Sequence, residues 1–214
     1  MRRVRLVAAV VLAMTASSLT LGAEPPPILQ ITIEGIAPGK EAEYGVIEED
    51  LAKLCARLDC PNNYLALLSL DAPQEVWWFV SYDSQADVER VAAGYASNRP
   101  LLEAMRALAA RKSGFAAQPV EHWTKLRADL SDAVSWAIGT TRFAVIATLA
   151  SGGGTVFETA DERYFTILTA NKRAEATAAA VRLGADARVF EVRPSWSRPA
   201  ADWTIASPDI WTLP

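Results

Sequence analysis

The sequence predicts an α+β protein built from two related halves whose antiparallel sheets pack face to face. Three observations lead to this prediction. Strand and helix patterns recur in a similar order in the two parts of the 214-residue chain. The predicted helices carry apolar residues at the three-and-four spacing of a one-sided helix. Two predicted strands are apolar on both faces, which is typical of a sheet that is covered on both sides.

The first 23 residues have the layout of a secretory signal peptide. Three arginines within the first five residues precede an uncharged stretch over 6–21, which is followed by Gly22 and Ala23. A membrane-spanning helix needs about 20 predominantly apolar residues, and this stretch is shorter and is interrupted by serines and threonines. We therefore expect no stable membrane anchor and a mature protein that begins near Glu24 in the periplasm or the medium.

The charge of the chain argues against nucleic acid as a partner. Cleavage of the signal would remove three of the 21 basic residues and none of the 25 acidic residues. The mature surface is then clearly acidic, and an acidic surface repels phosphate backbones.

The predicted first half, residues 24–117, contains a strand, a helix, a hairpin and a further helix. Their ranges are a strand at 28–34, a helix at 40–58, hairpin strands at 64–70 and 75–82, and a helix that starts after Ser84, breaks at Pro100 and continues over 101–110. Ser84 followed by Asp87 is a typical helix start, and a proline inside a helical pattern ends or kinks the helix. This order is ferredoxin-like but lacks the last strand.

The predicted second half, residues 118–214, repeats that order in a shortened form. Its elements are a helix at 119–130, a strand at 142–149, a glycine-rich loop, a hairpin of 155–158 with 163–169, a helix capped by Asn171 that ends at Gly184, and a strand at 188–193. The first helix of the ferredoxin-like motif is missing. The tail from Pro194, which contains three tryptophans, predicts an irregular strap packed on the core.

The strands of the first hairpin determine the expected architecture. Both alternating sets are apolar in YLALLSL (64–70) and in most of EVWWFVSY (75–82). Helices can cover only one face of a ferredoxin-like sheet. The other face must therefore meet a second sheet, either from the second half of the chain or from the partner in a homodimer.

Two segments carry a resemblance to a known family. ILQITIEGIAPGKEAEY and NYLALLSLDAPQEVWWFVSYDS resemble the dimeric α/β-barrel superfamily, and within it small exported bacterial proteins of the antibiotic-biosynthesis-monooxygenase type, over about residues 28–115. The resemblance implies two ferredoxin-like units packed sheet to sheet around a cavity. The superfamily includes cofactor-free oxygenases, haem-degrading enzymes, chlorite dismutase-like proteins and proteins with no known activity. It therefore implies a fold more strongly than a function.

Cys55 and Cys60 are the only cysteines. On an unbroken helix, residues five apart point about 140° away from each other and could not bond. If the helix stops near Asp59, the following turn could bring the sulfur atoms together. Because disulfides persist outside the cytoplasm, we predict a Cys55–Cys60 bond, with two buried free thiols as the alternative.

The inventory of reactive residues is short, and it predicts no metal and no cofactor. His122 is the only histidine, so zinc or copper sites made of several imidazoles and thiolates are excluded. Its neighbours suggest the surface of the helix at 119–130, and it lies outside the segment that resembles the family, whose haem-degrading members use a histidine on the iron. The loop Ser151–Gly154 lacks the lysine of a phosphate-binding loop. Glu48 and Glu49 are expected on the solvated face of their helix.

The aromatic residues of the hairpin are the best candidates for a site. Trp77, Trp78, Phe79 and Tyr82 on one strand, with Tyr64 on its hairpin partner, either line a cavity between the sheets or fill it as packed core. Polar contacts to a ligand would come from Asn63, Arg142 or His122.

Two functions follow from these candidates. The favoured hypothesis is an exported, non-enzymatic protein that binds a small apolar or aromatic ligand or a protein partner, because the sequence contains no catalytic constellation of titratable residues. The alternative is a cofactor-independent monooxygenase that acts on aromatic substrates. Such an enzyme holds an electron-rich ring in a dry pocket.

Overall fold

The computed structural model describes residues 24–132, 136–150 and 153–200. The predicted signal peptide and the last part of the predicted strap therefore lie outside the described residues. Within them, no helix is long and apolar enough to cross a membrane.

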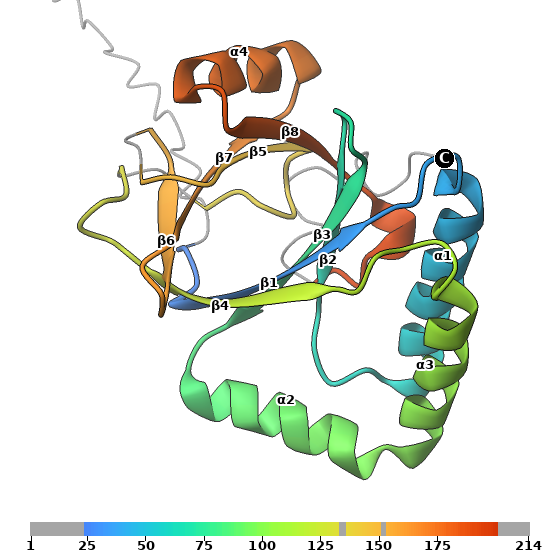
Figure 1. Cartoon of the computed structure of the whole chain (residues 1–214). Coiled ribbons are helices and arrows are strands. Elements are labelled where there is room, and N and C mark those ends of the chain that lie inside the picture. The colour runs from blue at the N-terminus through green and yellow to red at the C-terminus, as the bar shows by residue number, and fades with distance from the viewer. Residues whose placement is uncertain (1–23, 133–135, 151–152, 201–214) are drawn as a thin grey trace, which may run out of the picture.

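The core of the molecule is a closed barrel of antiparallel strands in the order β1-β3-β2-β8-β5-β7-β6-β4 (Figure 1). The strands are β1 (Ile28–Gly35), β2 (Leu65–Ser69), β3 (Glu75–Tyr82), β4 (Val120–Leu126), β5 (Phe143–Ala147), β6 (Thr155–Thr159), β7 (Tyr164–Ala170) and β8 (Ala187–Val192). A closed barrel pairs every strand on both sides and leaves no free sheet edge.

The barrel consists of two sheets with the same internal order. The first sheet runs β4-β1-β3-β2, and the second runs β8-β5-β7-β6. They join where β2 pairs with β8 and where β4 pairs with β6. The predicted α+β fold of two ferredoxin-like halves is thus confirmed, and both sheets come from one chain, so the barrel closes without a partner.

The prediction of a helix at 119–130 is wrong, because Val120–Leu126 form strand β4. Its exposure alternates with the period of a strand: Glu121, Trp123 and Lys125 are exposed, whereas His122 and Thr124 are buried. The sequence predicted no last strand for the first ferredoxin-like unit, and β4 is that strand. The first sheet therefore extends to Leu126, beyond the boundary expected at residue 117.

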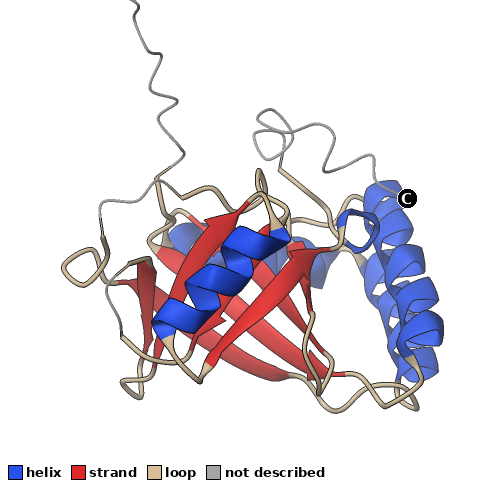
Figure 2. Ribbon diagram, turned by 90° about the horizontal axis from the view of Figure 1, so that it is seen from above, coloured by secondary structure: helices blue, strands red, loops and turns tan. Residues whose placement is uncertain are grey.

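Helices cover the outside of each sheet unequally. The helices α1 (Glu41–Leu58), α2 (Gln85–Ser97) and α3 (Arg99–Lys112) lie outside the first sheet, and α4 (Arg173–Leu183) lies across the second (Figures 1 and 2). No helix separates β5 from β6 in the described residues, as predicted.

The predicted starts of α2 and α3 and the predicted end of α4 at Gly184 are confirmed, whereas the predicted start of α4 is not. The Ser84 side chain accepts the Asp87 N–H at the start of α2, and Pro100 stands in the first turn of α3. The prediction that Asn171 caps this helix is wrong, because Lys172 occupies the cap position of α4 and makes no side-chain hydrogen bond there.

Side chains from both sheets and from the connecting segment occupy the barrel lumen. The buried cluster consists of Leu29, Ile31, Leu65, Leu67, Trp77, Phe79, Trp136, Ile138, Ala144, Ile146, Phe157, Phe165, Ile167, Phe190 and Val192. Rings contact each other across the halves, with Trp77 5.8 Å from Phe165 and 5.1 Å from Phe190 between centroids. Trp77 and Phe79 therefore belong to packed core, as one of the two interpretations of the aromatic strand expected.

The predicted disulfide between Cys55 and Cys60 is present, and no described cysteine is free. Helix α1 ends at Leu58, and Asp59 takes the left-handed conformation with a φ of 53°. The chain turns back so that the Cys60 N–H donates to the Cys55 carbonyl over 3.0 Å. This turn brings the two Cα atoms to 4.7 Å, a separation that suits a disulfide.

The described part of the predicted strap packs on α1 through a tryptophan. A short 3-10 helix, η1 (Pro194–Trp196), places the buried Trp196 ring against Tyr44, with centroids 5.8 Å apart. A Cβ atom on Gly45 would lie 2.9 Å from the Trp196 ring. Only glycine lets the strap approach the helix this closely.

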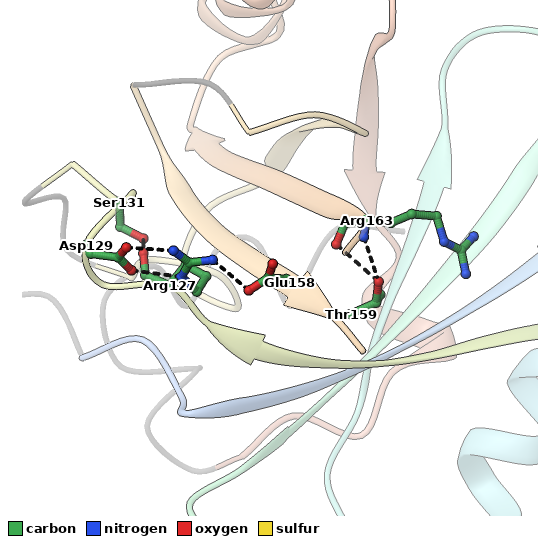
Figure 3. A network of polar contacts seen from close by, with 6 residues as sticks. All are labelled: Arg127, Asp129, Ser131, Glu158, Thr159 and Arg163. Carbon is green, nitrogen blue, oxygen red and sulfur yellow. Dashed lines mark hydrogen bonds and ion pairs between the residues drawn. The ribbon is translucent and has the colours of Figure 1, made fainter. Parts of the chain in front are cut away.

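The seam between β4 and β6 is held by an ionic network (Figure 3). The Arg127 guanidinium donates to Asp129 over 2.7 and 2.8 Å and to Glu158 over 2.6 Å. The Ser131 hydroxyl donates to the Arg127 carbonyl and accepts the Val156 N–H. These bonds tie the end of the first sheet to the second and help close the barrel.

Candidate ligand-binding site

A cavity of about 410 Å³ lies between the outer face of the first sheet and the helices that cover it. Its lining consists of Gln30, Thr32, Leu51, Cys55, Asn62, Tyr64, Trp78, Val80, Tyr82, Val88, Val91, Ala92, Tyr95, Met105 and Trp123. The alternating direction of side chains along β3 explains why the cavity lies on the outer face. Trp77 and Phe79 point into the lumen, whereas Trp78, Val80 and Tyr82 point outward. The expectation of a cavity between the two sheets is therefore corrected, because this cavity lies on the helix side.

Aromatic rings form two walls of this cavity. The Tyr64 and Trp78 rings meet edge to face with centroids 5.8 Å apart. The Tyr82 and Trp123 rings stack at 5.6 Å. Trp123 is 42% exposed and also borders a second pocket along β4 and β6, so it lies at the edge of the cavity.

Hydrogen bonds within the wall fix most of its polar groups. The Tyr82 hydroxyl donates to Gln30 over 3.0 Å, and the Gln30 amide donates to Glu121 over 2.7 Å. The Trp123 indole N–H also donates to Glu121. Burial raises the pKa of Tyr82 to about 12, so its hydroxyl stays neutral near pH 7.

Tyr64 differs from the other cavity tyrosines. It is 7% exposed, and its hydroxyl is buried without a hydrogen-bond partner among the described residues. Burial, with the nearby Glu48 carboxyl as the second cause, raises the pKa of Tyr64. Tyr95, in contrast, donates its hydroxyl to Asn62 over 2.7 Å.

A buried ionic cluster of Glu34, Tyr44, Glu48 and Lys112 adjoins the cavity. The Lys112 ammonium donates to Glu34 over 2.6 Å and to Glu48 over 2.8 Å, and the Tyr44 hydroxyl donates to Glu34 over 2.5 Å. Glu48 is fully buried, and burial raises its pKa against the opposing effect of Lys112. The same ammonium lies 5.9 Å from the centre of the Trp78 ring, which lines the cavity.

The prediction that Glu48 is solvated was wrong. Helix α1 has a second packed side, because α3 lies beside it and brings Lys112 over this carboxyl. The helical periodicity of α1 alone could not reveal a cation that comes from 64 residues further along the chain.

The structure brings together only part of the predicted site. Tyr64, Trp78 and Tyr82 all line the cavity, and the lining residue Asn62 takes the place expected for its exposed neighbour Asn63. Gln30, Tyr95 and Trp123 were not predicted. No signal in the sequence marks Trp123, because the apolar residues Val120, Trp123 and Leu126 have the spacing of a helix.

Arg142 and His122 lie elsewhere. Arg142 pairs with Glu191 in the second half over 2.8 Å. His122 is buried on the lumen side of β4, not on a helix surface, with its ring 5.4 Å from Phe165 and its Nδ1 3.3 Å from the Arg163 guanidinium. Among the residues that the structure describes, no group of three or more histidine, cysteine, aspartate or glutamate side chains is placed to hold a metal ion.

Comparisons with known proteins find likeness in structure only. Neither a family model nor a curated protein matches the chain. A protein provisionally named a monooxygenase from Fusobacterium nucleatum is similar with a TM-score of 0.47 at 9% identity, over 79% of this chain and 92% of the other. A protein of the same provisional name from Lactobacillus acidophilus has a TM-score of 0.44 at 11% identity, over 78% and 94%.

A mutant chlorite dismutase from Candidatus Nitrospira defluvii, in complex with cyanide, has a TM-score of 0.42 at 8% identity, over 80% of this chain and 92% of the other. At these values the likeness concerns the course of the chain and carries no conclusion about activity.

Proposed function

We propose that this protein is exported and binds a small, uncharged and predominantly apolar ligand in the cavity between the first sheet and its helices. The observation that carries the proposal is the lining: aromatic and aliphatic side chains dominate it, and none of its residues is charged. Its volume of about 410 Å³ is in the range of ligand sites, about 300–1,000 Å³.

The lining selects against charged ligands. An ion that enters such a cavity loses its hydration without gaining a counterion, which costs much more free energy than the transfer of a neutral group. Flat rings are favoured, because Trp78 and Trp123 offer aromatic contacts beyond the apolar area that they bury.

Export is supported by the basic and then uncharged start of the sequence and by the Cys55–Cys60 disulfide. Protein purified from the native host should begin near Glu24. A chain that retains its first 23 residues would contradict this part of the proposal.

The binding proposal can be tested with two probes that share one ring system. N-phenyl-1-naphthylamine is uncharged, and 1-anilinonaphthalene-8-sulfonate adds a sulfonate. We expect saturable binding of the uncharged probe, seen as increased fluorescence, and at least about tenfold weaker binding of the anion because its charge must be desolvated.

Two neighbouring alanines in α2 give a matched pair of variants. Both alanines are exposed, but only Ala92 belongs to the lining, so Ala92→Leu should narrow the cavity and weaken the uncharged probe, whereas Ala93→Leu should not. Equal binding of both probes, or no difference between the two variants, would contradict the proposal. Oxygen consumption with aromatic substrates would replace it with the monooxygenase alternative, which rests on the sequence resemblance.

A further inference from the structure

We infer that the second pocket, along β4 and β6, is a subsite for an uncharged, hydroxylated head group of the ligand, such as a sugar, while the rest of the ligand occupies the apolar cavity. The inference rests on the proposed function, because the second pocket extends the same site. It narrows the ligand to a neutral amphiphile, with an aromatic or aliphatic body joined to a group that carries several hydroxyls.

The second pocket adjoins the cavity and has a volume of about 550 Å³. Val88 and Trp123 line both spaces, so the two meet where the start of α2 faces β4. The polar residues of the second lining are Gln85, Thr124, Lys125, Glu158, Thr159 and Glu162. A ligand with an apolar body and a polar head group therefore finds a suitable lining for each part on either side of Trp123.

The strand register makes the two linings one continuous surface. Along β4, Trp123 and Lys125 are exposed and the intervening Thr124 is buried, so the first two project from the same outer face. Trp123 lies opposite Gln30 of β1, which lines the cavity. Lys125 lies opposite Glu158 of β6, which lines the second pocket. The outer face thus passes from one space to the other over about 7 Å of strand.

The second pocket differs from the cavity in its charges. Its lining includes Lys125, Glu158 and Glu162, whereas no residue of the cavity lining is charged. Arg127 already donates to Glu158 over 2.6 Å and neutralises it (Figure 3). Lys125 and Glu162 remain as one cation and one anion. A neutral head group suits this balance better than an ion, which would lose hydration without gaining a net counterion.

Hydroxyl groups match the polar side chains that this pocket offers. Among the described residues, the Gln85, Lys125 and Glu162 side chains make no hydrogen bond or ion pair within the protein, and all three are exposed. The ammonium only donates, the carboxylate only accepts, and the amide does both. A hydroxyl also donates and accepts, so a group with several hydroxyls can bond to side chains of each kind.

Trp123 provides an aromatic surface between the two parts of the site. Its ring stacks on Tyr82 at 5.6 Å between centroids, and it remains exposed beside the second pocket. The faces of an aromatic ring are electron-rich, so the slightly positive C–H groups of a sugar pack against them. The hydroxyls of such a sugar lie around its edge, where the polar side chains can reach them.

The test compares 2-naphthyl β-D-glucoside with 2-methoxynaphthalene, which has the same rings and ether oxygen but no sugar. Both are measured by displacement of N-phenyl-1-naphthylamine from the full-length mature protein. We expect the glucoside to bind at least about fivefold more tightly, because it adds hydrogen bonds in the second pocket. 2-Naphthyl β-D-glucuronide adds a carboxylate to the same sugar, and we expect it to bind at least about threefold more weakly than the glucoside.

A double variant removes two of the available polar side chains. In Gln85→Met with Lys125→Met, the advantage of the glucoside should fall to within about twofold. The affinity for 2-methoxynaphthalene should stay the same, because neither residue lines the cavity. Lys53→Met is the control, since it removes an exposed lysine outside both linings and should leave the advantage unchanged.

The outcomes separate this inference from the proposed function. If neither 2-methoxynaphthalene nor the displaced probe binds, the cavity proposal fails, and this inference fails with it. If both bind but the glucoside has no advantage, or if the double variant retains the advantage, the head-group subsite is overturned while the cavity proposal stands. Tighter binding of the glucuronide than of the glucoside would overturn the assignment of a neutral head group.

Discussion

The two halves of the barrel differ in how their helices meet the sheet. In the second half, Ala176 and Ala179 of α4 are buried against Phe143, Val145 and Val189. Small side chains let the helix approach the sheet closely.

In the first half, the facing side chains are large rings. The cavity lies beneath α2, between Trp78, Tyr82, Trp123 and Tyr95, and Val91 is the only described residue of α2 that is buried. Rings of this size separate the helix from the sheet, and their rigid shapes leave a space. Two sheets with the same strand order can therefore be covered by their helices in different ways because of the side-chain size in one layer.

The largest expected effect comes from enlarging an alanine in each layer. Ala176→Leu inserts three carbon atoms into the filled layer of the second half and should lower the free energy of unfolding by about 1–3 kcal/mol. Ala92→Leu in the first half should change it by less than about 0.5 kcal/mol, because Ala92 is exposed at the edge of the cavity. Urea unfolding of both variants measures the difference, and equal losses would show that the two layers are equally filled.

The disulfide is a second difference between the halves, because both cysteines lie in the first. Replacing Cys55 and Cys60 with serine should lower the free energy of unfolding by about 2 kcal/mol, since the unfolded chain loses a short constrained loop. Thermal unfolding before and after reduction of the wild type supplies the matched measurement. An oxidised wild type with the stability of the double variant would contradict the expectation.

The smallest effect concerns His122, where the first half meets the second in the lumen. Burial, assisted by Arg163, lowers the pKa of His122 from its ordinary value of 6.5. The unfolded chain therefore binds a proton more readily than the folded one, and the contribution of His122 to stability is lost as the pH falls below 6.5. His122→Gln should reduce the loss of stability between about pH 7.5 and pH 5.5. A slope identical to that of the wild type would show that His122 does not titrate differently in the two states.

Local patterns predicted much of the fold. The strand at Ile28, the helix that ends at Leu58 and the hairpin around residues 71–74 all depend on neighbouring residues, and each was placed within about two residues of its observed bounds. The Cys55–Cys60 disulfide could also be predicted, because it depends only on where one helix ends.

Other features were beyond such patterns. β4 was taken for a helix because its short run of mixed residues fits both periods, and only its pairing with β1 and β6 makes it a strand. The burial of Glu48 depends on Lys112, and the engagement of Arg142 depends on Glu191, 49 residues away.

By itself, the sequence determined that this chain forms two ferredoxin-like sheets and that Tyr64, Trp78 and Tyr82 are its best candidates for ligand contact. These properties follow from short-range periodicity, which depends only on neighbouring residues in the sequence. The tertiary structure alone decided that the sheets close into one barrel, that the cavity lies on the helix side of the first sheet, and that Lys112 pairs with the buried Glu48 beside it. The physical reason is that pairing, filling and hydrogen-bond satisfaction depend on groups from distant parts of the chain, which meet only after folding.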